Sequence, residues 1–152
     1  MRMWCRYAQA HEGIVLRIEP NLQKDSNLTQ FRAVKYQEKR PPLYDDPVSY
    51  LEGALFEDQN ERAKLLLDKV VYAKTFEWEY EHEQRLAIPI VDGKDWTVMP
   101  YYPEEIAELY LGAKMNDDTK RQIVTLAKAV NPEITIFQAV KGSTEISFFL
   151  VR

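Results

Sequence analysis

Residues 106–140 read IAELYLGAKMNDDTKRQIVTLAKAVNPEITIFQAV, and this stretch decides the predicted fold. The apolar run 106–111 predicts a short buried strand, although its spacing also fits a helix. Residues 118–130 then predict a helix, because Asn116 or Asp117 can cap it and Pro132 follows its end. A second strand is predicted at 134–140. Strand, helix and strand in one sheet make a right-handed crossover between parallel strands.

The flanking sequence predicts further strands around this crossover unit. Apolar, β-branched runs indicate strands at 14–18, 31–36, 85–91 and 145–151, with 96–100 returning as a hairpin partner of 85–91. Helices are predicted at 3–10, at 47–56 after the capping residue Asp46, and at 59–73. We therefore expect an α+β protein with a single mixed, mostly antiparallel sheet and about three helices packed on it. Residues 1–152 are expected to form one domain.

Composition narrows the class of protein. The chain has 152 residues, a formal net charge of −4 and one cysteine, Cys5. One cysteine excludes a disulfide within the chain and favours a reducing compartment, so we expect a cytoplasmic protein. No apolar run reaches the roughly 20 residues that span a bilayer. The acidic balance makes nucleic-acid binding unlikely, because that function needs a basic surface.

A polar segment, KTFEWEYEHEQR at residues 74–85, carries the most chemistry. If it is extended, Glu81, Glu83 and Arg85 share one face; if it is helical, Glu81 and Arg85 still meet. Like charges raise the pKa of a carboxyl group and a nearby Arg lowers it, which is how acid–base sites are tuned. We expect these three residues to be catalytic. Lys74 and Trp78 are expected ligand-binding residues. The competing interpretation is an ion pair on a solvated face, with Trp78 in the core.

The N-terminal segment offers a second group of residues. On a helix Trp4 and Tyr7 share a face, and they would form an aromatic wall of a ligand pocket with His11 at its rim. Core packing is the alternative for both aromatic residues. Cys5 and His11 also suit a nucleophile and its base, although a lone cysteine is more often packing. No spacing of His, Cys or carboxylates predicts a metal site, and no glycine-rich phosphate loop is present.

Two segments resemble a bacterial family of domains of unknown function. The first is MWCRYAQAHEG at 3–13, which has the family's Met-Trp, Tyr-Ala and His-x-Gly residues but Arg6 where many members have His. The second matches Lys74, Trp78 and the Glu-x-Glu-x-Arg of 81–85, and a weaker match ends at Gly112. Members usually carry a segment before Met-Trp. The resemblance therefore implies that this chain is a C-terminal portion of the family domain.

The Glu-x-Glu pair also resembles the motif of arginine-directed ADP-ribosyltransferases. That resemblance implies that Glu83 stabilises an oxocarbenium-like transition state, that Glu81 orients the acceptor, and that NAD is the cofactor. The substrate would be a nucleotide or a protein side chain. The alternative function is a non-catalytic interaction module of a bacterial defence or stress system. A missing N-terminal strand would leave the 14–18 strand with a bare edge, so a homodimer is expected in either case.

Overall fold

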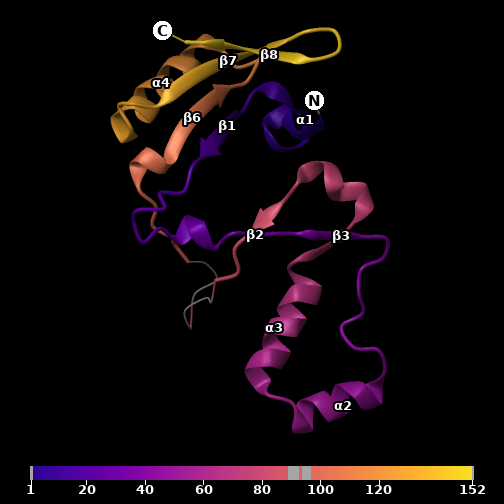
Figure 1. Cartoon of the computed structure of the whole chain (residues 1–152). Coiled ribbons are helices and arrows are strands. Elements are labelled where there is room, and N and C mark those ends of the chain that lie inside the picture. Colours follow the sequence, from indigo (N-terminus) through magenta and orange to yellow (C-terminus); the bar gives the residue numbers. More distant parts are fainter. Residues whose placement is uncertain (1, 89–92, 94–96, 152) are drawn as a thin grey trace. The chain divides into compact units, whose positions relative to one another are not determined.

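The computed structural model describes residues 2–88, 93 and 97–151. The chain forms two compact units, of which unit 1 comprises residues 1–29 and 99–152 and unit 2 comprises residues 30–98 (Figure 1). Both units combine helices with paired strands. The predicted α+β class is therefore confirmed.

Unit 1 is built on a four-stranded mixed sheet. Its strands are β1 (Ile14–Ile18), β6 (Ile106–Leu111), β7 (Thr135–Lys141) and β8 (Ile146–Leu150), in the order β1-β6-β7-β8. The β6–β7 pair is parallel, and the β1–β6 and β7–β8 pairs are antiparallel. Helix α4 (Asp117–Val130) connects the two parallel strands (Figure 1). The strand that sequence spacing left ambiguous, β6, is thus a central strand of the sheet.

The alternation of side chains along β6 sends neighbouring residues to opposite faces. Leu109 and Leu111 are buried in an apolar cluster to which Ile123 of α4 also packs. Tyr110 instead packs toward a second cluster formed by Trp4, Ala8 and Ala139. Trp4 belongs to α1 (Arg2–Tyr7), so α4 and α1 cover different faces of the sheet.

The turn after β6 requires glycine because two backbone segments meet there. A Cβ atom on Gly112 would lie 2.2 Å from the carbonyl oxygen of His11 and 2.6 Å from that of Gly13. The amide of Gly112 donates to the Gly13 carbonyl at 3.0 Å, and the amide of Lys114 donates to the His11 carbonyl at 2.9 Å. The predicted helix over 3–10 is wrong at its end, because η1 (Gln9–His11), with positive φ at each residue, follows α1 instead.

Unit 2 combines two helices with two short two-stranded ladders. Helices α2 (Pro47–Phe56) and α3 (Gln59–Val70) are capped by the side chains of Asp46 and Asp58, each of which accepts two backbone amide protons. Strands β2 (Arg32–Ala33) and β5 (Gln84–Arg85) pair antiparallel, and β3 (Lys35–Gln37) and β4 (Ala73–Thr75) pair parallel. The predicted helix 59–73 therefore ends early, since residues 73–75 form β4.

Three other elements differ from the sequence prediction. The strand expected at 31–36 is split into β2 and β3 at Val34, whose amide donates to the carbonyl of Glu83. The polar sequence of residues 21–29 predicts a loop, but the structure has the short helix η2 (Asn27–Gln30) at its end. The expected hairpin of 85–91 with 96–100 lies partly outside the described residues, and 86–88 and 97–100 are not in strands. Within the described chain, no helix has the length and apolar character needed to cross a membrane.

Candidate functional site

In unit 2, four charged side chains of the polar segment form one network. We call it the Lys74 cluster (Lys74, Glu81, Glu83 and Arg85). The ammonium group of Lys74 on β4 pairs with the carboxylate of Glu81 and lies 3.1 Å from Oε2 of Glu83. Arg85 donates to both oxygens of Glu83, from Nε at 2.6 Å and from Nη2 at 2.9 Å. Two anions and two cations thus alternate in one network, and the sequence interpretation had named all four residues.

Partial burial strengthens the Coulomb attraction within these ion pairs relative to pairs on an open surface. The side chain of Glu81 is 5% exposed, and those of Glu83 and Arg85 are 30% and 29% exposed. The fork of hydrogen bonds from Arg85 lowers the pKa of Glu83; burial opposes this effect and Lys74 adds to it. Burial alone would lower the pKa of Lys74, but its bonds to Glu81 and Glu83 raise it. Glu83 and Lys74 are therefore both charged at neutral pH.

The cluster does not arise from the extended row that the alternating sequence suggested. Glu81 ends the 3₁₀ helix η3 (Phe76–Glu81), and His82 has a left-handed backbone with φ of 44°. Across that turn, the carboxylates of Glu81 and Glu83 both reach the ammonium group of Lys74. The phenol oxygen of Tyr36 accepts the amide proton of Glu83 at 2.8 Å and holds the turn. The sequence interpretation did not include Tyr36, because it lies 47 residues away from Glu83.

Aromatic rings adjoin the charged network. The ammonium group of Lys74 lies 4.7 Å from the centroid of the Trp78 ring, a cation–π contact. The Trp78 and Tyr80 rings lie beside each other, with centroids 6.4 Å apart and planes 30° apart. Trp78 is half-buried, so it is neither a core residue nor fully exposed. An aromatic surface next to ionised carboxylates and cations is an arrangement that can hold a flat ring, hydroxyl groups and an anion.

The N-terminal candidates belong to unit 1. The rings of Trp4 and His11 are parallel, with centroids 6.3 Å apart, and both side chains are buried. Tyr7 is 59% exposed, so it has different surroundings from Trp4, although both lie on α1. Nε2 of His11 lies 3.1 Å from Sγ of Cys5, which is exposed. The structure thus brings together Trp4, His11 and Cys5, and leaves Tyr7 outside that group.

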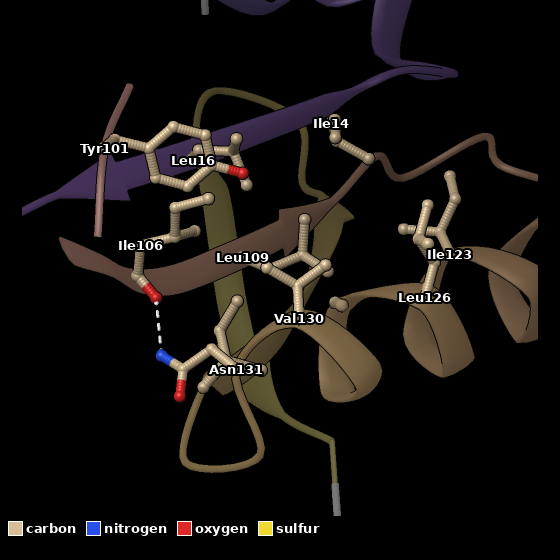
Figure 2. A pocket seen from close by; sticks show the side chains of 11 residues that line it. Ile14, Leu16, Tyr101, Ile106, Leu109, Ile123, Leu126, Val130 and Asn131 are labelled. Carbon is tan, nitrogen blue, oxygen red and sulfur yellow. Dashed lines mark hydrogen bonds between the residues drawn. The ribbon is translucent and has the colours of Figure 1, made fainter. Parts of the chain in front are cut away.

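An apolar pocket lies between α4 and the sheet of unit 1 (Figure 2). Its volume is about 150 Å³, and its walls include Ile14 and Leu16 of β1, Leu126 of α4 and Tyr101. Nδ2 of Asn131 donates to the carbonyl of Ile106 at 3.0 Å at one end of the pocket (Figure 2). The pocket can accept a small apolar group. Sequence reasoning missed it because the pocket depends on how α4 rests on β1 and β6.

Glu105 is a buried carboxylate that the sequence interpretation also missed. Its side chain is fully buried, and Oε1 accepts the amide proton of Asn21 at 2.8 Å while Oε2 accepts that of Tyr102 at 2.8 Å. Burial acts to raise the pKa of Glu105, but the bonds from Asn21, Ser26 and Tyr102 outweigh it and lower the pKa. These bonds join the 21–26 loop to η4 (Pro103–Glu105), so the role of Glu105 is structural.

The described residues hold no group of three or more His, Cys, Asp or Glu side chains arranged for a metal ion. No curated protein and no solved structure matches the chain. One family model, described as a protein of unknown function (DUF2971), matches residues 3–86. The matched range spans α1, β1 and the Lys74 cluster, and it covers more than half of the chain. The chain therefore belongs to the DUF2971 family of proteins of unknown function.

Proposed function

We propose that the Lys74 cluster and the Trp78 ring form a binding site for a nucleotide, with NAD as the first ligand to test. The observation that carries this proposal is the convergence of Glu81 and Glu83 on Lys74, beside the pair of rings formed by Trp78 and Tyr80. Aromatic faces stack on bases, carboxylates accept hydrogen bonds from ribose hydroxyls, and Lys and Arg pair with phosphates. The Lys74 cluster and the rings of Trp78 and Tyr80 together offer all three kinds of contact.

Glu83 has room for a further donor. A carboxylate has about four acceptor positions, two on each oxygen. Among the bonds between described residues, Oε2 of Glu83 accepts from Lys74 and Arg85, whereas Oε1 accepts from Arg85 alone. One position on Oε1 is therefore open to a ligand hydroxyl. Arg85 holds the carboxylate in place without filling that position, which is the preorganisation that a binding site needs.

The charge state of Glu83 decides which chemistry suits it. Its lowered pKa keeps it ionised, so it is a weak proton donor at neutral pH. An ionised carboxylate at a fixed position can instead stabilise positive charge that develops on a sugar ring. We therefore propose that, if a reaction occurs at this site, Glu83 acts as an electrostatic stabiliser in ADP-ribosyl transfer, with Glu81 oriented by Lys74 toward the acceptor.

Thermal unfolding with and without nucleotides tests the binding site. A ligand that binds only the folded state raises the melting temperature, by about 2.7 kcal/mol of stability at 100 times its Kd. We expect NAD to raise the melting temperature of the wild type by several degrees and to raise that of Glu83→Gln much less. Nicotinamide release from NAD by the wild type, and its loss in Glu83→Gln, then tests the transfer reaction separately.

Glu108→Gln is the matched control. Glu108 in unit 1 also pairs with an arginine, Arg17, at 2.7 Å, and the hydrogen bond from the Tyr110 hydroxyl, with the pair to Arg17, lowers the pKa of Glu108. Both variants remove one carboxylate charge from an arginine pair, so both are expected to lower the melting temperature without ligand. The NAD-dependent increase should persist in Glu108→Gln. If no nucleotide stabilises the wild type, the nucleotide site does not exist and an interaction module becomes the better description.

A further inference from the structure

Helix α2 of unit 2 has an apolar face that is exposed to solvent. Val48 is 63% exposed, Leu51 56%, Leu55 72% and Phe56 82%. The first three are spaced i, i+3 and i+7, so they lie on one face of the helix, and Phe56 adjoins them at its last residue. We call these four residues the α2 stripe. Single exposed apolar side chains are common, but four that adjoin one another on a short helix mark an interaction surface.

The opposite face of α2 packs on α3, which explains why the stripe points away from unit 2. The guanidinium of Arg62 on α3 lies 4.7 Å from the Tyr50 ring, and its Nη2 donates to the Tyr50 carbonyl at 3.1 Å. A Cβ atom on Gly53 would lie 2.9 Å from Nη1 of the same arginine. Tyr50 and Gly53 therefore face α3, and the helical period places the stripe on the other side. Within unit 2, α2 lies at the end away from the two ladders (Figure 1).

The charged residues that border the stripe are all acidic. Residues 45–58 contain no lysine or arginine, whereas α3 and α4 carry charges of both signs. The acidic residues of this segment are Asp45, Asp46, Glu52, Glu57 and Asp58. Glu52 lies beside the stripe, four residues after Val48 and three before Leu55, and the other four flank the two ends of the helix. Among the described residues, the ion pairs of unit 2 use other carboxylates, such as Asp68, so no basic side chain neutralises this border.

We propose that the α2 stripe docks on a partner protein that presents an apolar helix face bordered by lysine or arginine. Anchors at i, i+3 and i+7 are the pattern by which one helix packs on another. The acidic border attracts a basic one, and it repels an anionic membrane surface. Two stripes of identical copies would bring their acidic borders together, so a symmetric contact between copies is disfavoured. The anchors span only about 10 Å, at about 1.5 Å per residue, so we expect a small contact with a micromolar Kd.

A synthetic amphipathic peptide tests the proposal on the full-length protein. The probe is a fluorescein-labelled helix of about 18 residues with leucine on one face and lysine on the other, and the control peptide has glutamate in place of lysine. By fluorescence anisotropy, we expect the wild type to bind the lysine peptide about tenfold more tightly than the glutamate peptide. Combining Leu51→Gln with Leu55→Gln should weaken binding about tenfold, because two anchors become polar while glutamine keeps the helix propensity. Leu126→Gln is the matched control and should bind as wild type does, because Leu126 is 64% exposed but lies on α4.

Glu52→Gln tests the acidic border. It should weaken binding of the lysine peptide and reduce the salt dependence of its Kd between about 50 mM and about 300 mM sodium chloride. Glu145→Gln, at an exposed glutamate between β7 and β8, should change neither.

Four results would overturn the proposal. The first is that the wild type does not bind the lysine peptide, or binds both peptides equally. The second is full binding by the variant with Leu51→Gln and Leu55→Gln, which should fold because both leucines are exposed. The third is binding to phosphatidylcholine vesicles that this variant loses, which would identify a lipid surface as the occupant. The fourth is self-association in light scattering that the same variant loses, which would identify a second copy.

Discussion

Unit 1 and unit 2 are stabilised by different kinds of contact. The two apolar clusters of unit 1 lie on opposite faces of its sheet; they contain Leu109, Leu111, Met115, Ile134 and Ile136 in one and Trp4, Ala8 and Ala139 in the other. Among the described residues of unit 2, the buried apolar ones are Val34, Tyr72 and Ala73, all next to the short ladders. Apolar burial is therefore the main stabilising contribution in the sheet of unit 1. In unit 2, polar contacts fix a larger share of the described structure.

The polar contacts of unit 2 are centred on its two ladders. Arg85 donates to the carbonyl of Val71 at 2.5 Å as well as to Glu83. The hydroxyl of Tyr72 accepts the amide proton of Ala87 at 3.1 Å, and the guanidinium of Arg32 lies 4.1 Å from the Tyr72 ring. Such contacts specify geometry more than they add stability. The charged candidate residues thus lie in the unit whose described residues bury fewer apolar side chains, among ordered polar contacts.

The largest expected effect is on the core of unit 1. Leu109 is 1% exposed, so Leu109→Ala should leave a cavity and lower the free energy of unfolding by about 3 kcal/mol. Leu126→Ala is the control in the same unit. Because Leu126 is 64% exposed, its replacement should lower the free energy of unfolding by less than about 1 kcal/mol. Urea unfolding measures both. Similar losses in the two variants would show that the β6 side of the sheet is not the stabilising core.

The next effect is the acid sensitivity that Glu105 gives to unit 1. Its pKa is lowered in the folded protein, so the folded state binds the proton less readily than the unfolded state. The stability that Glu105 contributes is therefore present above the unfolded carboxyl pKa and is lost as pH falls through the lower folded value. In urea unfolding between about pH 6 and pH 3, Glu105→Gln should be less stable than wild type at pH 6, and the difference should shrink toward pH 3. If the difference in the free energy of unfolding between wild type and Glu105→Gln stayed constant with pH, the charge of Glu105 would not contribute, and only its shape would.

The smallest expected effect is on the charges of unit 2. Arg85→Gln removes both bonds to Glu83, and because the two side chains are about a third exposed we expect a loss of roughly 1–2 kcal/mol. Arg121→Ala on α4 is the comparison, since Arg121 and its partner Asp118 are 74% and 81% exposed and the pair should contribute below about 0.5 kcal/mol. Equal losses would remove the distinction between the Lys74 cluster and an ordinary surface ion pair.

Sequence patterns predicted the elements of unit 1 better than those of unit 2. The strands β1, β6, β7 and β8 and the helix α4 were all predicted within a few residues, because each is a long apolar or periodic run bounded by Gly, Pro or a capping residue, although the spacing of β6 also fitted a helix. In unit 2 the capping residue Asp46 predicted α2 and the helical spacing of apolar residues predicted α3, but β2 to β5 have only two or three residues each. A strand of that length has no readable period, and its existence depends on its partner.

For the candidate residues, the sequence predicted which residues matter but not how they contact one another. Composition and motif spacing selected Lys74, Glu81, Glu83 and Arg85 without any structure, because adjacent opposite charges are visible in the sequence. They did not predict how those residues meet, since the left-handed turn at His82 and the bond from the Glu83 amide to the Tyr36 hydroxyl are not visible as a local pattern. Glu105 and the apolar pocket were missed because each is assembled from segments about 80 or more residues apart. The expected homodimer and single domain stay predictions.

The sequence by itself determined the α+β class, the crossover from β6 through α4 to β7, the capped helices and the identity of the charged residues, since periodicity, capping and charge are local properties. The tertiary structure alone decided which of those residues meet. Glu81, Glu83 and Arg85, which were expected to form a row, instead form a network with Lys74. The imidazole of His11 lies against the sulfur of Cys5. Contacts of this kind depend on backbone turns and on partners from elsewhere in the chain, which no local pattern records.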